Sequence, residues 1–301
     1  MRRRYIAFLA FVSIAVACLV ALEAAIRIAL GIGFSDLTVI YRLNDQGYRD
    51  RPFTAERSPA SSRILMVGAS FLFGQSVQED DTLPRQLERQ LRDLGAPPAT
   101  AWNVSRQGWN TRAEVDAAVA MMDRYRFDSV ILVQTYNDIS LNAFEPGSMV
   151  ALWIAQKWLS AHIVLSALQR TFNPYFANYW TVTQRAYQDP GSAEQRQMAK
   201  ALADLRDRCE KEKIPLLVFY FELLTVDGDH RRALGAETVR RLTDGLNIPF
   251  LVFPPLPAGT DLNEWRAHPL DLHPNRRGHE RAARAIAQVL KENPRFLGAA
   301  E

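Results

Sequence analysis

Short apolar runs alternate with longer segments of helical periodicity along most of the chain. Each apolar run is a few residues long, which is typical of a buried parallel strand. The intervening segments place apolar residues three or four positions apart, as amphipathic helices do. We predict strands over residues 63–68, 100–104, 128–134, 214–221 and 248–253, and helices over 80–94, 111–124, 192–212, 236–246 and 277–291. This alternation predicts an α/β domain whose parallel, five-stranded sheet is covered on both faces.

The N-terminus carries a different pattern. Eighteen residues without a charge run from Tyr5 to Leu22, and as a helix they would be about 27 Å long, close to the hydrocarbon thickness of a bilayer. The preceding residues 2–4 are all arginine, which predicts a cytoplasmic N-terminus. We expect a single-pass helix in a bacterial inner membrane, with the remainder on the periplasmic side. A cleaved signal peptide and a lipoprotein signal at Cys18 are the alternatives.

The pattern divides the chain into three parts. We predict a membrane anchor over residues 1–33, a linker over 34–62 and a catalytic domain over 63–295. A helical insertion at 141–190 interrupts the domain, and its apolar run 149–168 has three readings. It is a cap helix on the domain, a face that touches the membrane or an acyl chain, or a second span.

Composition excludes several classes of function. The net charge is +3, and no basic patch or aromatic–basic motif indicates nucleic-acid binding. The two cysteines, Cys18 and Cys209, make neither a disulfide framework nor a metal cluster.

Four polar segments fall where such a sheet would gather them. Ser70 follows the first strand, Gly108 the second and Asn137 the third, while Asp271 and His273 precede the last helix. Open α/β sheets hold their sites at the carboxyl ends of the strands. A serine paired with a histidine, itself oriented by an acid, suits nucleophilic catalysis. Backbone N–H groups and an asparagine amide can donate to an oxyanion. Each segment alone is also an ordinary turn or loop, so the hypothesis rests on the set.

The set resembles the SGNH hydrolases, the GDSL-type esterase and acetyltransferase superfamily, at all four of its sequence blocks. The stretch from Gly68 to Pro84 and the upstream residues 44–49 look like those of bacterial membrane-anchored members. The resemblance runs from about Arg63 to Leu290. It implies a flavodoxin-like three-layer α/β/α fold and no metal or organic cofactor.

The resemblance also implies roles for individual residues. Ser70 would be the nucleophile, His273 the base and Asp271 the orienting acid. The oxyanion hole would comprise the Ser70 amide, the Gly108 amide and the Asn137 side chain.

Two positions depart from the family pattern. Ala69 stands where the usual Gly-Asp-Ser has its acid, which puts the hydrogen bonding of the serine turn in doubt. The acid and base are spaced Asp-x-His rather than Asp-x-x-His, a spacing also found in O-acetyltransferase relatives. His279 is expected to be a structural residue of the last helix, and His268 a loop residue.

Three functions follow as hypotheses. The first is a serine esterase or O-deacetylase that acts on an ester of an envelope glycan or lipid through an acyl-serine. The second is an O-acyltransferase, in which a polysaccharide hydroxyl replaces water. The third is a catalytically silent glycan-binding or scaffold protein, which Ala69 alone supports. The partners expected are the acylated glycan or lipid and the membrane, with no nucleic acid. Nothing in the sequence indicates the oligomeric state.

Overall fold

A computed structural model of the chain describes residues 2–30, 39, 41–56, 58, 61–143, 158, 160, 174–222, 230–257, 259–268 and 271–298. The contacts divide the chain into two compact units. The smaller unit comprises Met1–Val39 and Pro146–Tyr179, and the larger comprises Ile40–Glu145 and Trp180–Glu301.

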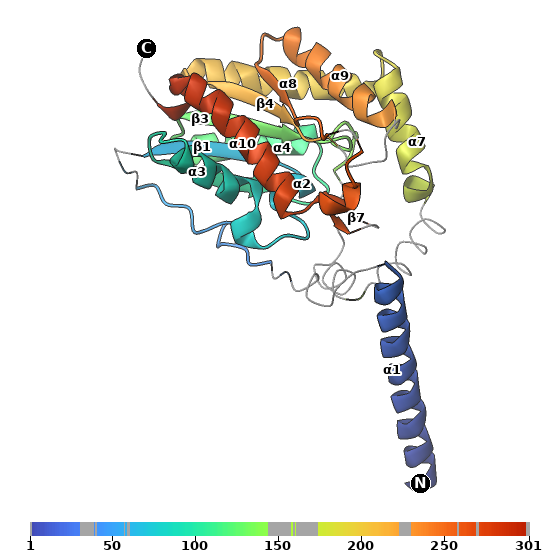
Figure 1. Cartoon of the computed structure of the whole chain (residues 1–301). Helices are drawn as coiled ribbons and strands as arrows, with labels where there is room; N and C mark the ends of the chain where they lie inside the picture. The colour runs from blue at the N-terminus through green and yellow to red at the C-terminus, as the bar shows by residue number, and fades with distance from the viewer. Residues whose placement is uncertain are drawn as a thin grey trace. The chain divides into compact units, whose positions relative to one another are not determined.

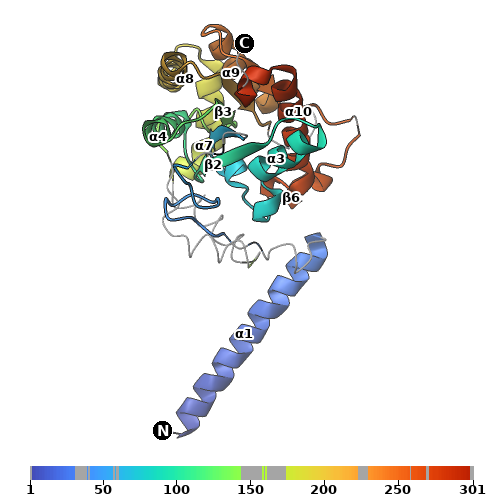
Figure 2. The same ribbon diagram turned by 90° about the vertical axis from the view of Figure 1, so that its left-hand side faces the viewer.

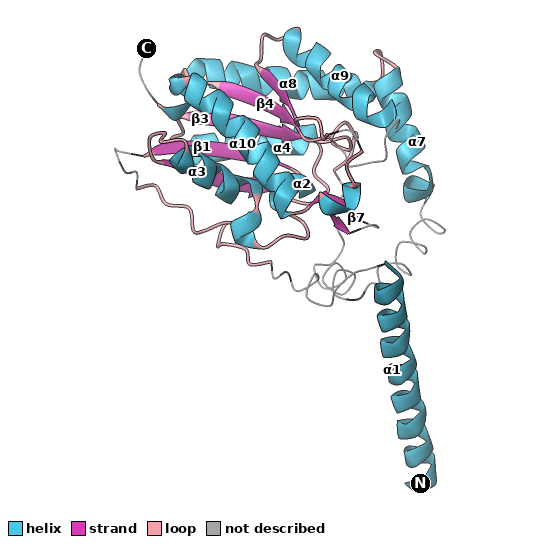
Figure 3. Ribbon diagram, viewed as in Figure 1, coloured by secondary structure: helices cyan, strands magenta, loops and turns pink. Residues whose placement is uncertain are grey.

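A five-stranded parallel sheet forms the centre of the larger unit (Figures 1 and 3). Its strands are β1 (Ser62–Gly68), β2 (Ala99–Ser105), β3 (Ser129–Gln134), β4 (Leu216–Tyr220) and β5 (Phe250–Val252). They lie in the order β2-β1-β3-β4-β5, and every neighbouring pair is parallel. This is the flavodoxin-like order of doubly wound folds. The predicted α/β fold class is confirmed.

Helices cover both faces of this sheet. On one face α3 (Leu83–Asp93) packs against α10 (Arg276–Glu292), and on the other α4 (Thr111–Arg124) packs against α8 (Ala193–Glu212) (Figure 2). All residues of β1 and β3 are buried. Because both faces are covered, the central strands read as near-continuous apolar runs.

Each strand and helix predicted from the pattern is present, although some ends differ. The helix α9 (His230–Asp244) begins before the predicted residue 236, and β5 is shorter than predicted. The pattern missed α7 (Pro174–Gln188), whose residues fall in the predicted insertion. It also missed short elements, because a few residues hold no readable period: α2 (Ser70–Phe73), β6 (Arg266–His268), β7 (Asp271–Pro274) and the 3₁₀ turns η2 (Glu79–Asp81), η3 (Leu262–Glu264) and η4 (Pro294–Leu297).

The smaller unit contains the helix α1 (Arg2–Leu30). Its segment Ala10–Ala29, with a mean hydropathy of 2.2, is the one stretch of the described residues long and apolar enough to cross a membrane. Two charges lie near its end, and Arg27 Nε donates to Glu23 Oε1 at 2.7 Å. The backbone N–H and hydroxyl of Ser160 both donate to Glu23 Oε2 at 2.8 Å. The Glu23 carboxylate is therefore neutralised and hydrogen-bonded within its own unit.

The predicted domain boundaries stay a prediction. Residues 41–56 of the predicted linker belong to the larger unit, where Tyr41 packs on Phe73 and Phe53 stacks on Trp102 of β2. Apart from Trp158 and Ser160, the apolar run 149–168 of the insertion lies outside the described residues.

Candidate active site

Ser70 follows the carboxyl end of β1, which lies between β2 and β3 in the sheet, and is the first residue of α2. The turn before it requires glycine at position 68, since a Cβ there would lie 2.8 Å from the Val133 carbonyl oxygen. Ala69 is fully buried at the N-cap position of α2. The Ser70 side chain is thus held at the carboxyl end of the strand, where open α/β folds place their sites.

A chain of hydrogen bonds joins Ser70 to the histidine and the acid. The Ser70 hydroxyl lies 2.8 Å from His273 Nε2, and His273 Nδ1 lies 2.5 Å from Asp271 Oδ1. Because Nδ1 donates to a carboxylate, Nε2 is left as the acceptor for the serine proton. Phe71 packs against the imidazole, with ring centroids 5.0 Å apart.

The Asp-x-His spacing follows from the local structure. Asp271 and His273 lie on the short strand β7, where alternate side chains point to the same side. The backbone N–H of His273 also donates to Asp271 Oδ1, at 3.0 Å. An extended backbone therefore brings acid and imidazole together with one residue between them.

Sequence reasoning missed a further contact of the acid. The Ser76 hydroxyl donates to Asp271 Oδ2 at 2.8 Å. Ser76 lies in the turn after α2 and has a φ of 70°. No sequence motif singled it out. The only available signal was its position in the stretch 68–84 that resembles anchored family members.

The residues expected to form an oxyanion hole follow three adjacent strands. In the sheet register Gly68 pairs with Ser105 of β2 and with Val133 of β3. The loops that carry Gly108 and Asn137 therefore begin on either side of the strand that leads to Ser70. Gly108 has a φ of 78°, a conformation that suits glycine. Both Gly108 and Asn137 are half-buried. Their role as oxyanion donors stays a prediction.

Asn137 is oriented by its own turn. Its Oδ1 accepts a hydrogen bond from the Thr135 hydroxyl at 2.7 Å. The buried carboxyl group of Asp138 accepts from the backbone N–H of Thr135, and its Oδ1 lies 3.0 Å from the same Thr135 hydroxyl oxygen. These contacts engage the amide oxygen of Asn137 and leave its Nδ2–H groups to donate elsewhere.

Two buried acidic residues, Glu114 and Asp138, support this turn. Gln134 Nε2 donates to Glu114 of α4, and both residues are fully buried. Burial, followed by the neighbouring Asp138 carboxyl, raises the pKa of Glu114 well above its usual range. Burial also raises the pKa of Asp138. Two adjacent carboxyl groups without solvent favour the protonated form of at least one of them.

His279 and His268 are not members of the hydrogen-bond chain that joins Ser70, His273 and Asp271. His279 is fully buried in α10 with its ring edge-on to Phe221, and burial lowers its pKa to about 3. It is therefore neutral and packs as a core residue. His268 lies on β6 and pairs with Asp271 of β7. Within the described ranges, no cluster of three histidine, cysteine or acidic residues is arranged to hold a metal ion.

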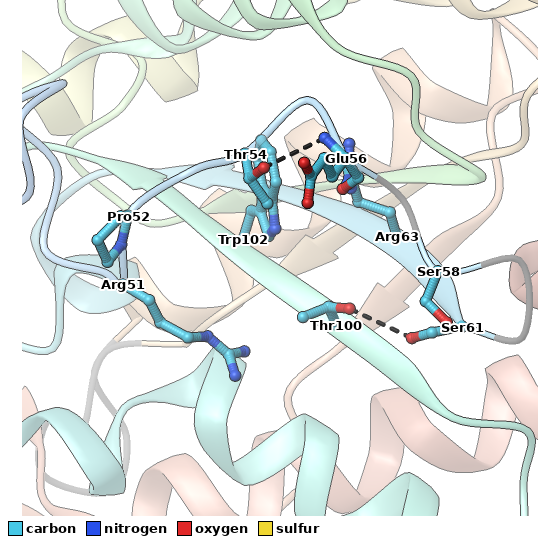
Figure 4. A pocket seen from close by; sticks show the side chains of 9 residues that line it. All are labelled: Arg51, Pro52, Thr54, Glu56, Ser58, Ser61, Arg63, Thr100 and Trp102. Atoms are coloured by element: carbon cyan, nitrogen blue, oxygen red, sulfur yellow. Dashed lines mark hydrogen bonds between the residues drawn. The ribbon is translucent and has the colours of Figure 1, made fainter.

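A polar pocket of about 200 Å³ lies elsewhere on the larger unit (Figure 4). Its lining includes residues from the first half of β1 and of β2, whereas Ser70 follows the opposite end of β1. Inside it the Arg63 guanidinium stacks over Trp102 at 4.5 Å and donates to the Glu56 carbonyl at 2.5 Å. Because the Arg63 guanidinium is already bound by Trp102 and by the Glu56 carbonyl, we assign this pocket no part in the chemistry of Ser70.

No protein-family model and no curated protein matches the sequence. Several solved structures are similar to the chain. TesA is 13% identical and aligns over 77% of this chain and 99% of its own, with a TM-score of 0.49. The psychrotrophic esterase EstA from Pseudoalteromonas sp. is 12% identical over 77% and 97%, with a TM-score of 0.48. A lipase/acylhydrolase from Enterococcus faecalis is 13% identical over 77% and 96%, with a TM-score of 0.46. At such identities the resemblance concerns the fold only, and the fold assignment itself rests on the strand order of this chain.

Proposed function

We propose that the chain is a serine hydrolase that cleaves ester bonds, with Ser70 as nucleophile, His273 as base and Asp271 as orienting acid. The observation that carries the proposal is the continuous hydrogen-bond chain from the Ser70 hydroxyl through both ring nitrogens of His273 to Asp271. A serine that only stabilises a turn does not need an imidazole oriented in this way.

The reaction follows from these contacts. The Ser70 oxygen attacks the acyl carbon of the ester while its proton passes to His273 Nε2. The negative charge that develops on the acyl oxygen is stabilised by the Ser70 and Gly108 amides and by Asn137 Nδ2. His273 then gives the proton to the leaving alcohol, and the acyl group stays on Ser70. Water, deprotonated by the same imidazole, releases the acid and restores the serine.

The substrate we propose is an ester of a cell-envelope glycan or lipid. The support is the apolar helix α1 with arginine at residues 2–4, which favours a bacterial inner-membrane anchor with the larger unit on the periplasmic side. An O-acyltransferase would share the acyl-serine and differ only in the acceptor. A glycan-binding protein without catalysis would leave Ser70 unreactive.

The test is ester hydrolysis by the full-length chain in detergent, with p-nitrophenyl acetate as substrate. Ser70→Ala and His273→Ala are expected to lower kcat at least about 10³-fold, because the residues of such a triad act as a unit. Ser61→Ala serves as the matched control and should retain full activity, because Ser61 is a half-buried serine that lies just before β1.

Labelling with a fluorophosphonate distinguishes the remaining readings. A label on Ser70 together with ester turnover supports the proposal, and product analysis with a glycan acceptor then separates hydrolysis from transfer. If Ser70 takes no label and the parent is no faster than Ser70→Ala, the hydrolase proposal is wrong and a binding role is favoured.

A further inference from the structure

We propose that Ser76 is a positioning residue for the orienting acid Asp271, and that Tyr41 and Arg49 hold Ser76 in the conformation that this role requires. The inference rests on the proposed function, because it concerns the same Asp271. It adds three residues to the site, two of them from the segment before the sheet.

Ser76 complements the contacts that Asp271 makes with the histidine. Asp271 Oδ1 accepts from His273 Nδ1 and from the His273 backbone N–H, while Oδ2 accepts from the Ser76 hydroxyl at 2.8 Å. The carboxylate is therefore held through both oxygens. The Ser76 hydroxyl thus opposes rotation of the carboxylate about its Cβ–Cγ bond, a rotation that would displace the imidazole bonded to it.

The backbone of Ser76 is unusual for a residue with a side chain. Its φ of 70° lies in the left-handed region, where serine is less stable than glycine. The residue keeps this conformation because its N–H donates to the Tyr41 hydroxyl at 2.9 Å. Glycine would relieve the strain and lose the hydroxyl that reaches Asp271. The presence of serine at a position that favours glycine points to a use for the hydroxyl.

Arg49 fixes the turn on which Ser76 lies. Its guanidinium is almost fully buried and donates to the carbonyls of Phe73, Gly74 and Val77, at 3.0 Å for the first and 2.6 Å for the last. Burial lowers the pKa of Arg49 to about 10, so the side chain is still charged at neutral pH. These carbonyls lie on both sides of Ser76 in the chain, and the turn is therefore clamped at its two ends.

Tyr41 and Arg49 also support each other. The Arg49 guanidinium lies 4.6 Å from the centroid of the Tyr41 ring, and the same ring packs against Phe73 at 5.2 Å. A buried cation over an aromatic face is held electrostatically. The segment 41–49 thus ends in contact with the turn 73–77, and through Ser76 it reaches the acid.

The test uses two variants of Ser76 in the full-length protein. Ser76→Gly removes the hydroxyl and relieves the backbone strain, whereas Ser76→Ala removes the hydroxyl and keeps the strain. Both should lower kcat for p-nitrophenyl acetate about 10-fold, the effect of losing a hydrogen bond to a charged group, with KM unchanged. The Tm should rise or stay constant in Ser76→Gly and fall in Ser76→Ala. The loss of rate would then follow the hydroxyl and not the stability.

A double-mutant cycle shows whether Ser76 acts through the acid. In an Asp271→Ala background, Ser76→Gly should change kcat by less than about twofold, because the group that it positions is absent. Tyr41→Phe should lower kcat less than Ser76→Gly does, since it removes the support and leaves the hydroxyl in place.

The outcomes separate the two proposals. If the parent hydrolyses the ester and Ser76→Gly is equally fast, or if Ser76→Gly costs the same in the Asp271→Ala background, the positioning role is wrong while the hydrolase remains. If the parent and Ser70→Ala are equally inactive, the proposed function itself falls, and the role of Ser76 falls with it.

Discussion

Asn137, which we propose as an oxyanion donor, is oriented by its neighbours. Its amide oxygen is occupied by the Thr135 hydroxyl, and Thr135 is in turn held by the buried carboxylate of Asp138. The amide is thus oriented before any substrate arrives. Donors fixed in advance stabilise an oxyanion without reorganisation during the reaction.

We predict that Asn137→Ala lowers kcat by about 10²-fold and leaves KM nearly unchanged, because an oxyanion donor acts in the transition state. The measurement is steady-state hydrolysis of p-nitrophenyl acetate. The matched control is Asn142→Ala, an exposed asparagine a few residues along the same loop, which should behave like the parent. Equal kcat in Asn137→Ala and Asn142→Ala would remove Asn137 from the oxyanion hole.

The helix α4 illustrates how an element ties the site to the core. The pattern Thr111-x-x-Glu114 at its start is that of a capping box. The structure contradicts this interpretation, because Asn110 is the N-cap and accepts from the Ala113 N–H at 2.9 Å. Thr111 instead bonds to Gln134 and to the Asp138 carbonyl, and Glu114 points into the core. The first turn of α4 thereby supports the loop that carries Asn137.

The buried Glu114 should make stability depend on pH. Its pKa is raised in the folded chain and is about 4.3 in the unfolded chain. From about pH 4.3 upward the folded state therefore keeps a proton that the unfolded state releases, so stability falls as pH rises, by up to about 1.4 kcal/mol per pH unit. Above the raised pKa the dependence ends.

We predict that Glu114→Gln lessens the decrease in stability between pH 5 and pH 8 and is at least as stable as the parent at pH 8, while the raised pKa of Asp138 maintains the rest of the decrease. The glutamine keeps an oxygen for Gln134 and cannot ionise. The measurement is the free energy of unfolding at each pH. The control is Glu210→Gln, an exposed residue of α8, which should keep the slope of the parent. An unchanged slope in Glu114→Gln would mean that Glu114 is ionised when folded.

At the scale of the whole chain, α1 differs in character from the larger unit. The large apolar side chains of the larger unit are mostly buried, whereas those of α1, such as Phe11, Ile14 and Val16, are exposed. A hydropathy of 2.2 over Ala10–Ala29 suits a lipid environment better than water. The two charges at Glu23 and Arg27 pair with each other near the end of this stretch.

We predict that Val16→Arg releases the chain from membranes. An arginine at the centre of a span costs about 2.5–3.5 kcal/mol on insertion, since its charge has no partner in the hydrocarbon. The measurement is the fraction of the chain that sediments with membranes after an alkaline carbonate wash. Val16→Leu is the control and should sediment fully. Equal sedimentation of Val16→Arg and Val16→Leu would show that α1 does not insert at this depth.

The order of elements could be predicted because it depends on local patterns. Apolar periodicity reports which side of a strand or helix is buried, and alternating strands and helices can cover a parallel sheet on both faces. The short apolar runs that predicted the strands also placed Ser70, Gly108 and Asn137 after successive strands. Because the carboxyl ends of parallel strands meet at one edge of the sheet, these residues could be expected to lie close together.

The tertiary structure alone decided the contacts between distant residues. Ser70 and His273 are 203 positions apart, and Ser76 and Asp271 are 195 apart. No local pattern encodes such pairs, because they depend on where loops close and which way single side chains point. The left-handed backbone of Ser76 and its hydrogen bond to Tyr41 are of this kind. Ser76 is held by Tyr41 and Asp271, which lie in two distant segments of the chain, and such contacts leave no periodic pattern in the sequence around it.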